Sequence, residues 1–108
     1  MKTNERLFVR LIGSVLISIA LTATAITEAG PKTITNVGVQ LTKPYFMTLE
    51  GWGSPCVYTI MYLPTLDTVA GKGLYAQIAL AKALGKKISR VDYTVAANVC
   101  TANLIEFY

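Results

Sequence analysis

The amino-acid sequence predicts a small, mostly β domain with one helix, in the order β-β-β-α-β-β. Three observations support this: short β-rich segments, one alanine-rich stretch with helical spacing, and glycine or proline clusters between them. Five strands with a helix between the third and fourth is the order of an OB-fold, a partly open barrel. The alternative is an α+β arrangement, a curved antiparallel sheet with one packed helix.

The N-terminus has the pattern of a secretory signal peptide. A basic start precedes an apolar stretch over residues 11–26, which is closed by small residues. Ala23-Thr24-Ala25 fits the A-x-A cleavage pattern, and Ala29 is a second possible cleavage point. An uncleaved anchor is the alternative, but a spanning helix needs about 20 mainly apolar residues.

We therefore expect a signal peptide over residues 1–25 and a single domain over residues 26–108. The protein is then periplasmic or secreted, and it meets a membrane only through the leader before cleavage. Removing the leader takes away three of ten basic residues and one of six acidic residues, so the net charge falls from +4 to +2.

Three strands are expected before the helix. Residues 26–32 contain Gly30-Pro31 and are interpreted as a loose entry, and residues 33–41 are β-branched and form the first strand. Pro44 is expected in a turn because it resists joining a ladder. Residues 45–50 form the second strand, with Tyr45, Met47 and Leu49 on one side. Residues 56–63 are apolar on both faces, which predicts a central third strand.

The alanine-rich stretch over residues 74–84 is the expected helix. Asp67 or Thr68 is its predicted N-cap, and Gly85 is a natural left-handed stop. Gly71-Lys72-Gly73 resembles a phosphate-binding turn but lacks the full motif, and we interpret it as a flexible hinge.

Two further strands are expected after the helix, over residues 87–95 and 102–108. Val91, Tyr93 and Val95 alternate in the first of them. We expect the last strand to present an apolar edge on which a neighbouring copy could pair.

Cys56 and Cys100 are the chain's two cysteines, and both follow the leader. In an oxidising compartment an even count indicates a disulfide, here with a single possible pairing. In the chain-entropy model such a bond stabilises the fold by roughly 4 kcal/mol. A redox pair is disfavoured because the cysteines are not in a C-x-x-C arrangement.

The composition argues against an enzyme. The chain has no histidine, so the commonest general base is missing, and two cysteines alone do not fill a zinc site. We expect no catalytic residues, no metal and no cofactor. Export and a low mature charge also argue against nucleic acid as a partner.

Binding fits the sequence better, and four residues are candidates for it. Trp52 stands between glycines, where an exposed indole could stack on a sugar or anchor a protein; the alternative is that it folds over the barrel end. Clustered cations near the helix end could bind anionic groups, although solvated helix ends also carry cations; they are Lys86, Lys87 and Arg90, with Lys82 beside them.

Residues 51–106 resemble a family of short secreted gammaproteobacterial proteins of unknown function. The resemblance rests on Gly51-Trp52-Gly53-Ser54-Pro55-Cys56, Tyr75 and Ala79 in the helix, Gly85-Lys86-Lys87-Ile88, Asp92-Tyr93, and Cys100 with Ala102 and Ile105. It implies export and a disulfide, with no known activity.

A more distant resemblance is to the OB-fold B subunit of subtilase cytotoxin and related pertussis-like toxins. It rests on Val37-Gly38, Thr42 and Pro44-Tyr45-Phe46, followed in order by the glycine-rich turn, the helix and Gly85-Lys86. The resemblance implies an oligomeric, glycan-binding subunit. Residues 26–32 lack the serine that grips sialic acid in those toxins, so the same glycan specificity is not expected. The expected partner is thus a protein or a glycan, with a homo-oligomer as the alternative.

Overall fold

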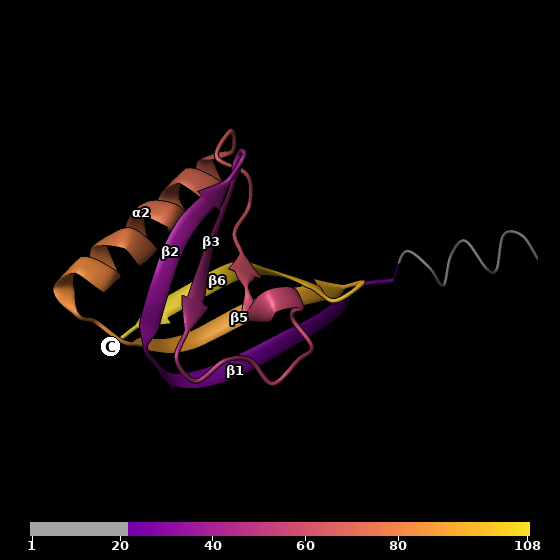
Figure 1. The fold of residues 1–108 in the computed structure, drawn as a ribbon, viewed down its shortest axis with the longest axis horizontal. Coiled ribbons are helices and arrows are strands. Elements are labelled where there is room, and N and C mark those ends of the chain that lie inside the picture. The colour runs from indigo at the N-terminus through magenta and orange to yellow at the C-terminus, as the bar shows by residue number, and fades with distance from the viewer. Residues whose placement is uncertain (1–21) are drawn as a thin grey trace, which may run out of the picture.

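The computed structural model describes residues 22–108, which form six strands, one α-helix and a 3-10 turn (Figure 1). Residues 1–21 of the expected leader lie outside the described part. The elements in chain order are β1 (Thr24–Lys32), β2 (Ile34–Gln40), β3 (Lys43–Thr48), the 3-10 turn η1 (Val57–Thr59), β4 (Met61–Tyr62), α2 (Val69–Leu84), β5 (Ile88–Ala96) and β6 (Val99–Phe107).

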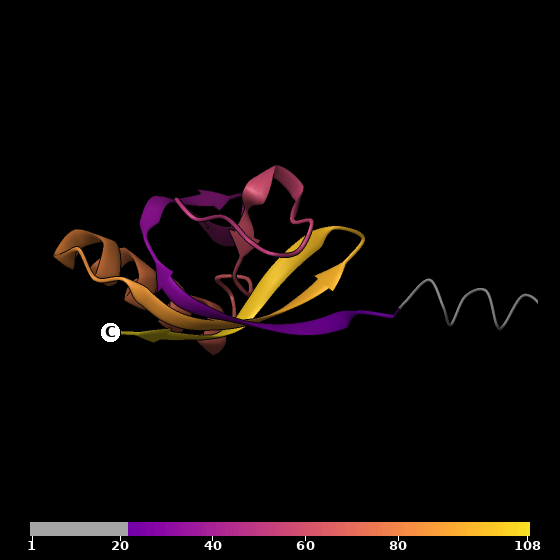
Figure 2. The ribbon, with the colours of Figure 1, turned by 90° about the horizontal axis from the view of Figure 1, so that it is seen from below.

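All six strands belong to one sheet, in the order β1-β5-β6-β4-β3-β2. Neighbours are antiparallel except β4 and β6, which are parallel. The prediction of a mostly β domain with one helix is confirmed. The edge strands β1 and β2 are not paired with each other, so the sheet is open, as in the curved-sheet alternative. They are nevertheless consecutive in the chain, separated only by Thr33, so the backbone joins the two edges of the curled sheet (Figures 1 and 2).

The expected loose entry over residues 26–32 is wrong, because this segment is most of β1. It pairs with β5 from Thr24 opposite Val95 to Lys32 opposite Ile88. Its register shifts between Ala29 and Lys32, where a Cβ on Gly30 would lie 2.0 Å from the Ile88 carbonyl oxygen. Glycine is therefore needed at this bulge. Pairing with β5, distant in sequence, overrides the weak local strand propensity.

The expected central strand over residues 56–63 is also wrong in most of its length. Only Met61–Tyr62 form β4, and η1 occupies Val57–Thr59. Tyr58 has a φ of 53° and is 81% exposed, so the apolar run is not buried on both faces. The Cys56 disulfide and a hydrogen bond from Val57 N to Asn98 O (2.8 Å) hold this segment against the end of the β5–β6 hairpin instead.

Pro44 does not lie in a turn but inside β3, opposite Val39 of β2. Its carbonyl oxygen accepts a hydrogen bond from Leu63 N at 2.8 Å, so the residue still contributes to packing and pairing without an N–H. The buried face of β3 consists of Pro44, Phe46 and Thr48.

The helix α2 begins five residues earlier than expected, at Val69. Thr68 is its N-cap, since the Thr68 hydroxyl accepts from Gly71 N at 3.0 Å. Gly85 ends the helix with a φ of 69°, as expected. The predicted hinge is wrong: Gly71 and Gly73 are helical. A Cβ on Gly71 would lie 2.1 Å from the Thr65 carbonyl oxygen, because the first turn packs directly on residues 64–65.

The β5–β6 hairpin turns at Ala97 and Asn98, whose φ values of 50° and 62° suit a two-residue primed turn. Residues Val91 and Tyr93 of β5 are buried, as the alternation predicted. The expectation that the last strand is an edge is wrong, because β6 lies between β5 and β4. However, β4 pairs with β6 only at Cys100 and Thr101; beyond them α2 lies alongside β6.

The core lies between the concave sheet and α2. It contains Phe46, Met61, Leu63, Ile78, Ile88 and Val91, all fully buried. The expected disulfide is present: Cys56 and Cys100 are bonded, with their Cα atoms 5.4 Å apart. It fastens the segment before η1 to β6.

Candidate functional site

Trp52 lies in the loop after β3 and packs on the sheet. Its ring meets Phe46 edge-on with centroids 5.7 Å apart, and Tyr93 similarly at 5.8 Å. Its Nε1 donates to the Thr59 carbonyl oxygen at 3.2 Å. The indole is half-buried and packs at the edge of the core. Its use as a sugar platform stays a prediction.

A lysine sits beside this indole. Lys32, at the end of β1, is only 7% exposed, and its Nζ lies 4.8 Å from the centroid of the Trp52 ring. The ammonium donates to the Gly51 carbonyl oxygen at 2.8 Å and pairs with Glu28 Oε1 at 3.2 Å. A buried ammonium requires partners of this kind, and a cation facing an aromatic ring adds a further attraction.

The Glu28 carboxylate is the centre of the polar cluster. It accepts from Gly53 N at 3.1 and 3.0 Å and from the Tyr93 hydroxyl, besides pairing with Lys32. Burial raises the pKa of Glu28, but the hydrogen bonds from Tyr93, Gly53 and Lys32 outweigh it and hold the pKa below its ordinary value. Glu28 is therefore ionised at neutral pH.

Tyr93 links the cluster to the core. The residue is 1% exposed, and its hydroxyl is hydrogen-bonded both to Glu28 and to Ser54 Oγ, the latter at 2.9 Å. Burial, and then the hydrogen bond with Glu28, raise the pKa of Tyr93. The phenol is thus protonated at neutral pH and serves as a hydrogen-bond donor.

The Glu28 cluster, made of Glu28, Lys32, Ser54 and Tyr93, joins three segments that are distant in sequence. It ties the edge strand β1 to the loop at residues 51–54 and to β5. Among residues 22–108 no buried side-chain nitrogen or oxygen lacks a partner. The buried polar groups of the Glu28 cluster are therefore hydrogen-bonded within the protein, and such a satisfied network stabilises the packing of the three segments.

The predicted basic cluster is only partly assembled. Lys86 and Lys87 are exposed after Gly85, and no carboxylate in residues 22–108 forms an ion pair with them. Arg90 is instead paired with Asp92 at 2.8 Å and with Glu106 at 3.6 Å. The hydrogen bonds with Asp92 raise the pKa of Arg90 and lower that of Asp92. Arg90 is therefore engaged within the sheet, while the two lysines face solvent.

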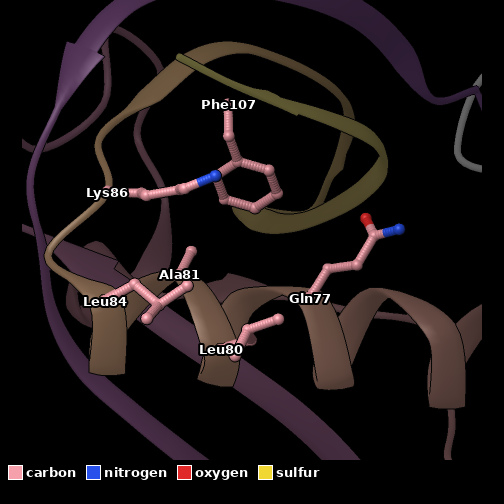
Figure 3. A pocket seen from close by; sticks show the side chains of 6 residues that line it. All are labelled: Gln77, Leu80, Ala81, Leu84, Lys86 and Phe107. Carbon is pink, nitrogen blue, oxygen red and sulfur yellow. The ribbon is translucent and has the colours of Figure 1, made fainter.

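A shallow apolar hollow of about 120 Å³ lies between α2 and the end of β6 (Figure 3). Phe107 points from β6 toward the helix, where Leu80 and Leu84 lie opposite it, and Lys86 stands at the rim. Its lining residues are Gln77, Leu80, Ala81, Leu84, Lys86 and Phe107. Lys86 is the one predicted binding residue that lines it.

The sequence does not single out Glu28 and Lys32, because Gly30-Pro31 gives residues 26–32 the composition of a loop. Their four-residue spacing puts them on one face of a strand, but that signal appears only once a strand is assumed. The hollow was also missed. Leu80 and Leu84, one helical turn apart and off the buried stripe, were the available signal.

Within the described residues, no group of three histidine, cysteine or carboxylate side chains could hold a metal ion. No helix within residues 22–108 is long and apolar enough to cross a membrane. Comparison of the chain with protein-family models, with curated proteins and with solved structures found no match.

Proposed function

We propose that this chain is an exported, disulfide-bonded binding domain that acts through non-covalent contacts with a protein or a glycan. The observation that carries the proposal is the Cys56–Cys100 bond. Disulfides form and persist in oxidising compartments, and small exported domains use them to supplement a small core. The signal-peptide pattern before the domain supports the same compartment.

The Glu28 cluster supports binding rather than catalysis. A general base needs a free acceptor near a substrate, whereas the Glu28 carboxylate is paired with Lys32 and accepts from Gly53 and Tyr93. The Tyr93 and Ser54 hydroxyl groups are hydrogen-bonded to each other. Exposed side chains on the rest of the surface are therefore the better candidates for function.

The same cluster favours cleavage after Ala25 over cleavage after Ala29. A chain that begins at Gly30 lacks Glu28, which leaves the buried Lys32 ammonium without its carboxylate. A chain that begins at Ile26 keeps Glu28 and nearly all of β1. Loss of one partner of a buried ion pair is strongly destabilising.

The second candidate is a subunit of a homo-oligomer similar in arrangement to the toxin B subunits. The curved sheet with one helix is compatible with it, although fold alone does not establish function. The open edges that could pair with a neighbour are those of β1 and β2, not that of β6.

Native mass spectrometry of the protein, expressed as the full chain and recovered from the periplasm, tests both candidates. We expect a chain beginning at Ile26, two hydrogens lighter than its reduced form. A monomer supports the binding domain. Binding of the unchanged protein to a glycan array is then compared with that of the Trp52→Ala variant. A defined oligomer favours the subunit. An intact leader or two free thiols contradicts export.

A further inference from the structure

The outward face of α2 is apolar along its whole length. Val69 is 91% exposed, Leu80 59% and Leu84 62%. With 3.6 residues per turn, six exposed apolar positions fall within an arc of about 100°, and Ala70 and Ala79 are exposed on either side of it; the six are Val69, Gly73, Ala76, Leu80, Ala83 and Leu84. A helix on the surface of a soluble domain usually presents polar side chains there. We call these six residues the outer α2 face.

Exposed apolar side chains continue this face at both ends of the helix. Tyr108, 67% exposed, follows Phe107 of the hollow. At the other end the β2–β3 turn reaches the start of α2, where Thr42 O accepts from Leu66 N, and Leu41 in this turn is 96% exposed. Figure 1 shows this turn beside the first turn of α2. Large groups of exposed apolar side chains are typical of interaction sites.

The charges around the outer α2 face are positive. The helix contains no acidic residue. Lys72 borders the apolar arc, Lys86 lines the hollow, and Lys87 is exposed next to Lys86. Two carboxylates close to these segments have partners: Asp67, two residues before the helix, accepts from the Thr65 hydroxyl and keeps its negative charge, and Glu106 pairs with Arg90.

We propose that the outer α2 face docks on an anionic lipid surface, which departs from the sequence-based expectation that the protein meets a membrane only through its leader. Interfacial helices place leucine and aromatic side chains at the acyl boundary and lysines at the headgroups, and each lysine near the surface adds attraction to anionic lipid. An exposed helix face suits a fluid surface, because lipid needs no matching groove on the protein. This inference relies on the proposed function for one thing, the export that brings the domain to a membrane.

Other occupants fit the face less well. In a second copy packed helix to helix, the lysines of both copies would come together without an acidic partner, and like charges across an interface are unfavourable. A glycan requires many hydrogen-bonding groups, and the uncharged polar side chain in the hollow is that of Gln77 alone.

The test uses the processed protein from the periplasm, after its mass has shown a start at Ile26 and an intact disulfide. Sedimentation is measured with vesicles of phosphatidylcholine alone and of phosphatidylcholine mixed with phosphatidylglycerol. We expect binding at least about tenfold tighter to the anionic vesicles, weakened by salt. If export fails, the measured mass shows an intact leader or free thiols before any vesicle is added, so this failure is distinguished from a failure of lipid binding.

Two variant sets separate docking from simple charge attraction. Leu80→Ser with Leu84→Ser should lose most vesicle binding, and Lys86→Gln with Lys87→Gln should weaken it. Tyr58→Ser, which removes an exposed apolar side chain of η1, is the matched control and should bind like the unchanged protein. Circular dichroism checks that each variant is folded, as expected for exposed positions.

Three results overturn the proposal. The first is equal or absent binding to the two kinds of vesicle. The second is binding to anionic vesicles that the leucine changes leave intact, which would mean attraction by charge alone. The third is a dimer in solution that dissociates with Leu80→Ser and Leu84→Ser, which would assign the face to a second copy.

Discussion

Glu28 Oε1 and Lys32 Nζ lie 3.2 Å apart, on side chains of one edge strand that also reach the Trp52 loop. An edge strand has only one neighbour to hold it, here β5. The pair supplies a second attachment, because Glu28 binds Gly53 N and Lys32 binds Gly51 O. The stability of β1, and with it the attachment of this open edge to the rest of the domain, should therefore depend on this pair.

Replacing Glu28 by glutamine should destabilise the domain by about 3 kcal/mol. The buried Lys32 ammonium would lose its counter-ion. The NH₂ group of the new amide would also face hydrogen-bond donors, the Gly53 N–H and the Tyr93 hydroxyl. Urea unfolding followed by Trp52 fluorescence measures the change. Glu106→Gln is the control, because this exposed carboxylate leaves Arg90 still paired with Asp92. Equal effects of the two changes would contradict the role given to Glu28.

Acid should unfold the protein only at low pH. The pKa of Glu28 in the folded state lies below its ordinary value of 4.5, so the unfolded chain binds the proton more tightly. The stabilisation is complete above about pH 4.5 and is lost as pH falls through the lower, folded pKa. Urea midpoints measured from neutral pH downward should stay level and then fall. Glu28→Gln should fall less steeply, and an unchanged slope in this variant would refute the assignment.

The parts of the fold that could be predicted are those fixed by neighbouring residues. The cap at Thr68 and the stop at Gly85 depend on side chains and glycine within one turn of the helix. The alternation of Val91 and Tyr93 likewise appears within a single strand.

The parts that could not be predicted depend on contacts between distant residues. β1 forms because β5 pairs with it, and residues 57–59 leave the extended conformation where the Cys56–Cys100 bond holds the chain. The Glu28 cluster needs the pairing of β1 with β5, since Gly53 and Tyr93 reach the carboxylate only in the folded sheet. No local pattern contains that information.

Two glycines of α2 should respond in opposite ways to alanine. Gly71→Ala places a Cβ 2.1 Å from the Thr65 carbonyl oxygen and 2.4 Å from that of Pro64, so the helix start must move and stability should fall. Gly73→Ala meets nothing within 4 Å and should stabilise the helix by about 1 kcal/mol. Thermal unfolding of both variants measures this. A loss of stability at both positions would mean that Gly73 also lies in a tight contact.

The disulfide should contribute more to stability than any other single feature. Reduction, or Cys56→Ser with Cys100→Ser, frees the segment before η1 from β6 and restores entropy to the unfolded chain, a loss of roughly 4 kcal/mol. Because Cys100 is fully buried, a serine there also leaves a hydroxyl in the core. Unfolding of the oxidised protein is therefore compared with that of the reduced wild type, which keeps the sulfur atoms in place. If the two unfold at the same urea concentration, the bond is dispensable and the fold rests on its core alone.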